Sequence, residues 1–273
     1  MSRSPRQTDR RAGKGLMAMT MLALALGVSG CANSKMTTGS VNRSHGKSVD
    51  SMSAGELGSA AERLGQAYAR NPKDRDGTLA YADVLRMSGR NDQALAVMRK
   101  LAIDYPKDRG VLAAYGKALA GAGQLEAALD AIRRAQTPEY PDWKLLSAEG
   151  AILDQLGTAD DARTLYRKAL DLKPNEPSVL SNLGMSYILS GDLKTAETYM
   201  RNAASQPGAD SRVRQNLALV VGLQGRFEEA EQIARQELSP ADAEANVAYL
   251  RGMLAQQNSW SQLEDKSKAK AVK

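Results

Sequence analysis

Two residue types that carry much of the nucleophilic and acid–base chemistry of enzymes occur once each in this 273-residue chain, as Cys31 and His45. A lone cysteine cannot form an internal disulfide, and one sulfur cannot build a metal site. Neither residue has a sequence neighbour that would complete a nucleophile–base pair. The chain also lacks a GxxxxGK(S/T) phosphate-binding loop. We therefore expect no catalytic residue, no metal and no cofactor, and we predict that the protein is not an enzyme.

The N-terminus has the organisation of an export signal. Residues 1–15 contain five basic residues and one acid, and residues 16–28 (LMAMTMLALALGV) contain no charge. A helix that spans a bilayer needs about 20 apolar residues, so this run is too short for a transmembrane anchor. A basic segment followed by a short apolar run and small residues is typical of a signal peptide. An ordinary signal peptide with an incidental cysteine, or a short buried helix, remains as an alternative.

The four residues Val28-Ser29-Gly30-Cys31 resemble the lipobox of bacterial lipoproteins. The resemblance implies cleavage between Gly30 and Cys31 and attachment of a diacylglyceryl group to the Cys31 sulfur. Two or more acyl chains anchor a protein stably, at about 0.8 kcal/mol per buried CH₂ group. Ala32 stands where an aspartate would mark inner-membrane retention. The resemblance therefore implies localisation in the bacterial cell envelope, lipid-anchored at the outer membrane and facing the periplasm.

The net charge of +6 is concentrated at the two ends of the chain. Residues 1–30 carry a net charge of +4, which cleavage would remove, and residues 53–263 carry a net charge of −2. A slightly acidic globular part offers no basic face for a phosphate backbone. We expect no nucleic-acid partner and no small-molecule substrate.

Glycine and alanine recur at intervals of 34 residues in the remainder of the chain. Three registers agree over five copies: Gly89, Gly123, Gly157, Gly191 and Gly225; Ala94, Ala128, Ala162, Ala196 and Ala230; and Ala82, Gly116, Gly150, Gly184 and Ala218. Larger apolar residues recur beside them, with Met98, Ile132, Tyr166 and Met200 in one register. Agreement among several registers indicates a repeat architecture rather than a bias in composition.

This pattern resembles the tetratricopeptide repeat, in which 34 residues form two antiparallel helices. In such a repeat, the small residue of the first helix allows the second helix to cross closely, and a larger side chain would overpack the crossing at a cost of about 1–3 kcal/mol. The recurrent glycine lies just past the first helix, where a left-handed residue is wanted. Proline beyond the second helix ends it.

The repeats imply an all-α fold, a right-handed superhelix of about twelve helices. We expect full copies at about 75–108, 109–142, 143–176, 177–210 and 211–240, a capping helix at about 54–70, and a closing helix over 240–257 that the polar residues 256–258 end. Tyr249, Met253 and Leu254 are expected to pack back onto the last repeat, and Trp260 either packs there or is exposed.

The chain thus divides into a signal peptide (1–30), a lipidated flexible tether (31–52), a repeat domain (53–260) and a basic C-terminal tail (261–273). The tether is rich in polar residues and, from residue 32 on, has no aromatic side chain, so it cannot bury enough apolar surface to fold. A coil of this kind spans roughly 5–6 Å × √n for n residues.

A repeat superhelix offers a concave groove lined by its first helices. From the inward positions usual for the repeat, we predict a peptide groove in the fourth and fifth copies formed by Ser181, Asn182, Met185, Ile188, Arg212, Gln215, Asn216 and Leu219. Asn182 and Asn216 occupy equivalent places and are predicted to hold a peptide backbone; a purely structural role is the alternative. The clamp that binds chaperone tails in some members is not supported, because its places hold Ala113, Lys117, Ser147 and Ala151.

The whole chain resembles the TadD family, the repeat lipoproteins of the Tad (Flp) pilus assembly system. The resemblance rests on the lipobox, the polar tether, the repeats and the closing segment ANVAYLRGMLAQQNSW, residues 245–260. It implies envelope partners, namely a secretin or other pilus-assembly components. An adaptor for peptidoglycan hydrolases, or a regulatory subunit whose partner supplies catalysis, remains as an alternative.

Overall fold

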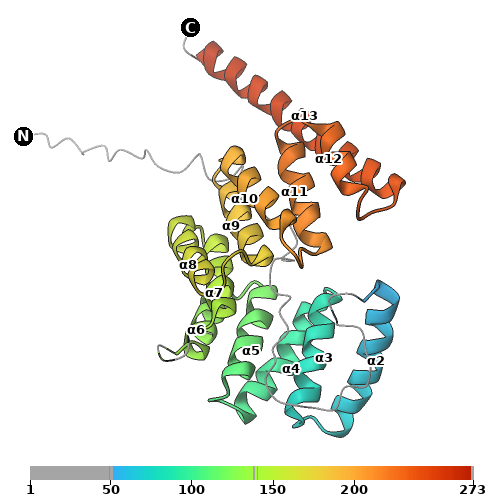
Figure 1. Cartoon of the computed structure of the whole chain (residues 1–273), viewed down its shortest axis with the longest axis vertical. Helices are drawn as coiled ribbons and strands as arrows, with labels where there is room; N and C mark the ends of the chain where they lie inside the picture. Colours follow the sequence, from blue (N-terminus) through green and yellow to red (C-terminus); the bar gives the residue numbers. More distant parts are fainter. Residues whose placement is uncertain (1–48, 50–51, 138, 140, 272–273) are drawn as a thin grey trace, which may run out of the picture.

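The computed structural model describes residues 49, 52–137, 139 and 141–271, and this part of the chain forms twelve helices and no strand (Figure 1). The helices are α2 (Ala54–Arg70), α3 (Arg75–Met87), α4 (Asn91–Asp104), α5 (Arg109–Gly121), α6 (Leu125–Ala135), α7 (Trp143–Gln155), α8 (Ala159–Leu172), α9 (Pro177–Leu189), α10 (Leu193–Ser205), α11 (Ser211–Leu223), α12 (Phe227–Ala234) and α13 (Pro240–Ala271). None of these helices has both the length and the apolar character that crossing a membrane requires.

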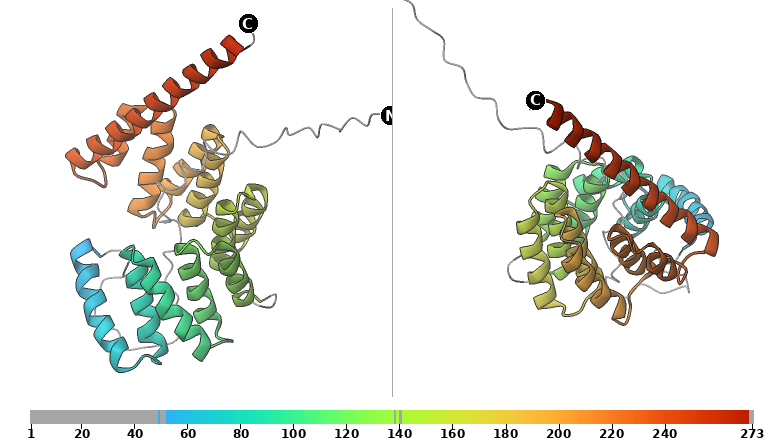
Figure 2. Two further views of the ribbon diagram at one scale, coloured as in Figure 1. Left: turned by 180° about the vertical axis from the view of Figure 1, so that it is seen from behind. Right: turned by 90° about the horizontal axis from the view of Figure 1, so that it is seen from above.

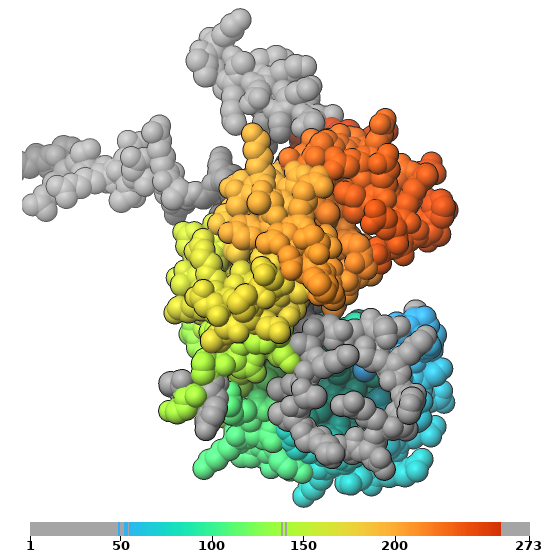
Figure 3. Space-filling model, in the orientation of Figure 1, coloured from blue at the N-terminus to red at the C-terminus, as the bar shows by residue number. Residues whose placement is uncertain are grey.

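Five helical hairpins follow one another with a constant period. The first helices begin at residues 75, 109, 143, 177 and 211, and the second helices begin at residues 91, 125, 159, 193 and 227. Each helix packs on the next along the chain, and each first helix also contacts the first helix of the following hairpin. Figures 2 and 3 show the hairpins stacked along a curved path without interruption. The predicted solenoid and its repeat boundaries are confirmed.

Helix α2 caps the N-terminal end of the array, as predicted. It begins at residue 54 because Ser53 and Glu56 form a capping box: the Ser53 backbone N–H donates to Glu56 Oε2 at 2.7 Å, and the Glu56 N–H donates to Ser53 Oγ at 3.3 Å. Val49 and Met52, at the end of the predicted tether, pack with α2 on a small apolar cluster that includes Val84. The array is therefore closed by side chains that precede α2.

The recurrent glycine ends the first helix of every repeat. Its φ angle lies between 71° and 83° in all five copies, a conformation that glycine adopts without steric cost. In the first copy the Gly89 N–H donates to the Arg86 carbonyl, and the Arg90 N–H donates to the Leu85 carbonyl at 2.9 Å. The same pair of bonds recurs in the later repeats. These bonds satisfy the last carbonyls of the helix and turn the chain back.

The glycine in the middle of the first helix permits the close crossing within a repeat. A Cβ atom placed on Gly150 would lie 2.8 Å from Tyr166 Cε1 and 3.1 Å from the Ala162 carbonyl oxygen. Gly116 and Gly184 meet their second helices at similar distances. The large side chains of this register, Met98, Ile132, Tyr166 and Met200, are at most 1% exposed. Backbone and side chains therefore interlock, as the repeat pattern predicts.

Ion pairs join the fourth and fifth repeats. Glu197 on α10 accepts hydrogen bonds from Arg226, from Gln224 Nε2 at 2.8 Å and from Arg201 at 2.8 Å. Arg201 also bonds Glu229 of α12 at 2.5 Å. The hydrogen bond from Arg226 is the largest cause that lowers the pKa of Glu197 to about 2. The carboxylate is therefore charged in the folded protein over the whole physiological range.

The closing helix α13 is longer than predicted. Its first half buries Ala243, Val247 and Leu250 against α11 and α12, but the helix continues past the expected end at residues 256–258 and reaches Ala271. No glycine or proline follows Gly252 in the chain, so nothing in this segment breaks a helix. Figure 1 shows the C-terminal half of α13 projecting beyond α12.

The crossing glycine provides a test of the repeat architecture. Gly150→Leu should lower the free energy of unfolding by at least the 1–3 kcal/mol typical of overpacking, because Tyr166 and the Ala162 carbonyl already fill the space. Gly252→Leu is the matched control: Gly252 lies in the same register on α13, and a Cβ there would meet nothing within 4 Å. Urea unfolding followed by circular dichroism measures both. Equal effects would contradict the account of the crossing.

The Glu197 network predicts a specific pH dependence. The folded-state pKa lies below the ordinary value of 4.5, so Glu197 contributes stability above pH 4.5, and that contribution is lost as the pH falls toward 2. The urea midpoint of Glu197→Gln should therefore fall below that of the wild type at pH 7, and the gap should narrow between pH 4.5 and 2. Glu126→Gln, an exposed carboxylate without an ion pair in the described residues, is the control. A gap that stays constant with pH would refute the assignment.

Candidate functional site

The residues that would attach the chain to a membrane lie outside the described part of the structure. Gly30 and Cys31 precede residue 49, as does His45, for which no role was predicted. Lipidation at Cys31 and cleavage before it therefore remain predictions from the sequence.

The predicted groove residues lie on α9 and α11, and they differ in how far their side chains are exposed to solvent. Ser181 and Ile188 are only 3% and 5% exposed, so neither offers a freely accessible side chain along the groove. Gln215 is exposed, and the remaining five are partly buried: Asn182, Met185, Arg212, Asn216 and Leu219. An Ile188 substitution would test folding rather than binding, because it belongs to the apolar core that α9 shares with α10 and α11.

The two equivalent asparagines bond the preceding repeat. Asn182 Nδ2 donates to Ser147 Oγ at 3.0 Å, and Asn216 Nδ2 donates to Ser181 Oγ at 3.1 Å. Each bond spans 35 residues and joins consecutive first helices. The asparagines therefore hold the register between repeats, which was the alternative to peptide binding. Each amide still has a second N–H and a carbonyl oxygen, which make no other hydrogen bond within the described residues.

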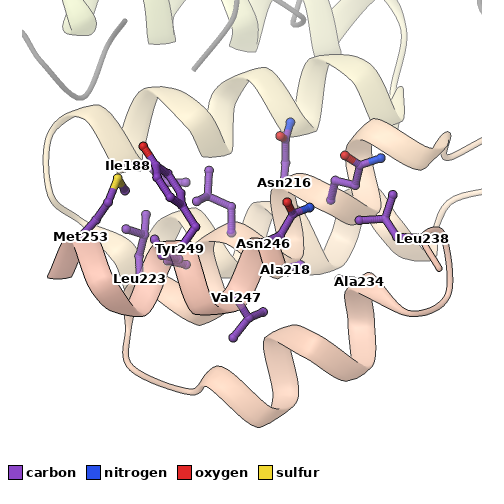
Figure 4. Close-up of a pocket in the computed structure, with 13 residues that line it drawn as sticks. Ile188, Asn216, Ala218, Leu223, Ala234, Leu238, Asn246, Val247, Tyr249 and Met253 are labelled. Atoms are coloured by element: carbon purple, nitrogen blue, oxygen red, sulfur yellow. The ribbon is translucent and has the colours of Figure 1, made fainter. Parts of the chain in front are cut away.

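A pocket of about 340 Å³ opens between α11 and α13 (Figure 4). Four of the predicted groove residues line it, namely Ile188, Gln215, Asn216 and Leu219. The opposite wall comes from α13, with Asn246, Tyr249 and Met253 pointing toward the same space. The structure thus brings half of the predicted groove together with Tyr249 and Met253, which were expected only to pack, and with Asn246, for which no role was predicted.

Tyr249 differs most from its predicted role. The expectation that it packs back onto the last repeat is wrong, since 64% of its surface is exposed. Met253 and Leu254 are partly buried, in line with packing, whereas the Trp260 side chain lies outside the described residues. Tyr249 is an aromatic side chain held at the rim of a pocket, with its hydroxyl free of any hydrogen bond in the described structure.

Asp154 is a carboxylate whose pKa is raised chiefly by burial, and it joins two repeats. Asp154 of α7 accepts a hydrogen bond from the Ser186 hydroxyl at 2.7 Å and from the Tyr166 hydroxyl at 2.9 Å. Burial raises the pKa of Asp154, and the two hydrogen bonds and Arg163 oppose that rise. The described residues contain no group of acids, histidines or cysteines arranged to hold a metal ion. Asp154 has its partners inside the fold, so its role is to join the third and fourth repeats.

Comparison with known proteins agrees with this architecture. Three family models, each described as a tetratricopeptide repeat, match residues 51–118, 114–177 and 212–236, which together make up more than half of the chain. No curated protein sequence gives a significant match.

Solved structures of repeat proteins resemble the chain at the level of the fold. The APC/C hetero-tetramer Cut9–Hcn1 matches with a TM-score of 0.56 and 17% identity over 74% of this chain, which spans only 41% of that chain. A tetratricopeptide repeat protein from Parabacteroides merdae gives a TM-score of 0.54 and 21% identity, covering 74% of this chain and 81% of that one. PilW, described as a type IV pilus biogenesis factor, gives a TM-score of 0.53 and 20% identity. The match covers 73% of this chain and 91% of that one.

The helical period, the turn glycines, the interlocked crossings and the family models all agree. The chain therefore belongs to the tetratricopeptide repeat family, whose fold typically serves as a scaffold for protein–protein interaction.

Proposed function

We propose that the protein is a lipid-anchored periplasmic scaffold that assists assembly of a Tad/Flp-type pilus, with a secretin or another pilus-assembly component as its partner. One observation carries the proposal. The closing segment, residues 245–260, is the part of the repeat domain that most resembles TadD, and its residues Asn246, Tyr249 and Met253 form one wall of the pocket. The segment of the resemblance and the candidate binding surface therefore coincide.

The N-terminal sequence supports the anchored location. A lipobox cysteine followed by a polar tether would place the repeat array near the membrane while leaving it free to move. Acyl chains on Cys31 would keep the array close to any machine in the same membrane and raise its effective concentration there. A scaffold for an outer-membrane assembly benefits from this arrangement.

The structural likeness to PilW supports the proposal only at the level of the fold. It is a likeness of fold at 20% identity, so it supplies no partner for this chain. It does provide an example of the same architecture in a protein described as a pilus biogenesis factor. The choice of a Tad/Flp-type system rests on the closing segment and the lipobox.

Cross-linking in the native cells tests the proposal. The acylated protein is isolated after mild cross-linking, and the proteins that accompany it are identified by mass spectrometry. We expect a secretin or another pilus component to be enriched over cells that lack the protein. Cys31→Ser should abolish membrane fractionation and reduce that enrichment, because the chain would lose its anchor. Recovery of peptidoglycan hydrolases without any pilus protein would refute the proposal and favour the adaptor function.

A further inference from the structure

The pocket lies where the repeat pattern loses a large side chain. The register that holds Met98, Ile132, Tyr166 and Met200 continues in the fifth repeat with Ala234, which lines the pocket. Helix α12 also ends at Ala234 after 8 residues, whereas the other second helices have 11 to 14. Space that a large buried residue fills in the first four repeats is therefore partly open in the fifth.

The closing helix does not fill this space. Leu250 of α13 lies so close to Gly222 that a Cβ on that glycine would be 2.5 Å from Leu250 Cδ2. Despite this close contact, about 340 Å³ remain between α11, α13 and the end of α12, within the usual range of ligand pockets of about 300–1,000 Å³. The void is thus a feature of how the array ends, not of a loosely packed helix.

We infer that this pocket binds an extended, uncharged segment of a partner protein, and that a large apolar side chain of the segment occupies the space left by Ala234. The inference rests on the proposed function, because it names the kind of partner segment that the scaffold would hold.

The lining of the pocket decides the charge of the occupant. Among the thirteen described residues that line it, none is acidic or basic. A charged side chain placed there would lose its hydration without gaining a partner, at a cost of several kcal/mol. Leu238, Val247 and Leu250 instead offer apolar surface. An aliphatic or aromatic side chain gains from burial against that surface.

The amides of the pocket decide the conformation of the occupant. Asn246 is exposed and makes no hydrogen bond in the part of the chain that the structure describes. Asn216 donates only one of its two N–H groups, to Ser181. A side-chain amide offers a donor and an acceptor together, which match the peptide group of an extended backbone. A helix already uses its peptide groups internally, so an extended segment fits these amides better than a helical one.

Tyr249 stands at the edge of this surface. It comes from α13 and points toward the same space as Ile188 and Met253 (Figure 4). An exposed aromatic side chain beside an apolar pocket can cover the occupant and exclude water from it, and tyrosine is among the residues enriched at the hot spots of protein interfaces. The pocket therefore has an apolar base, polar groups for the backbone and an aromatic rim.

Peptide selection on the full-length acylated chain tests the inference. A phage-displayed library of random 12-residue peptides is selected against the protein in detergent, after removal of phage that bind detergent micelles alone. Enriched peptides are synthesised with a fluorophore and measured by anisotropy. We expect enriched peptides to be uncharged at their centre and to carry leucine, isoleucine, methionine or phenylalanine there. Enrichment of charged peptides, or of none, would overturn the inference.

Ala234→Met gives the decisive variant, because it restores the residue that the first and fourth repeats carry. It should weaken peptide binding at least tenfold while leaving the melting temperature equal or higher, since it fills the void. Ala248→Met is the matched control: Ala248 is exposed on α13 and does not line the pocket, so binding should be unchanged. Asn246→Ala, at an exposed position where a substitution should leave the stability nearly unchanged, should weaken binding about threefold to tenfold. Binding by Ala234→Met as tight as by the wild type would overturn the inference.

The two proposals fail separately. If pilus components do not accompany the protein in cells but the peptides bind as described, the proposed function is wrong and the pocket assignment stands. If pilus components are recovered equally with wild type and with Ala234→Met, and Ala234→Met also binds peptides normally, the pocket assignment is wrong and the scaffold proposal stands.

Discussion

Every repeat depends on one close crossing, at which a small residue of the first helix lies against the backbone of the second. At Gly116, Gly150 and Gly184 an added Cβ would lie 3.1 to 3.2 Å from a carbonyl oxygen of the second helix. That closeness lets the large residue of the second helix pack across the first helix, where it is almost completely buried. Because each crossing determines the angle within a hairpin, it also determines how the next hairpin stacks, and the curved array follows.

The same constraint explains how the array ends. Helix α13 carries Gly252 in the crossing register, but among the described residues no second helix lies against it, and an added Cβ would meet nothing within 4 Å. In the preceding helix, α12, Ala234 takes the place of the large residue, and the helix ends after 8 residues. The closing helix covers part of the resulting apolar surface with Val247 and Leu250 and leaves the rest as a pocket. The candidate binding surface is thus a consequence of interrupting the repeat, and it requires no additional structural element.

Local signals allowed much of this fold to be predicted from the sequence. The start of each repeat, the extent of α2 and the turn glycines were predicted correctly, since each depends on a glycine, a proline or a small residue at a fixed interval. Features that depend on how neighbouring repeats pack were not predicted. These are the hydrogen-bond partners of Asn182 and Asn216, the burial of Ser181 and Ile188, and the exposure of Tyr249. Helix α13 is longer than predicted because the polar residues 256–258 can be accommodated within a helix and no glycine or proline follows Gly252. The change from a large residue to Ala234 is visible in the sequence, but its meaning requires the position of α13.

Site-specific photo-cross-linking in living cells would test most directly whether the protein acts as a scaffold through its C-terminal pocket. A benzophenone amino acid is placed at Tyr249, at the rim of the pocket, or at Ile103, which is 75% exposed on α4 of the first repeat. Both positions are accessible, so a difference between them reflects a binding site rather than exposure. The account predicts a discrete cross-linked product with another envelope protein from position 249 and none of that mass from position 103. The same product from position 103, or its absence from position 249, would contradict the account.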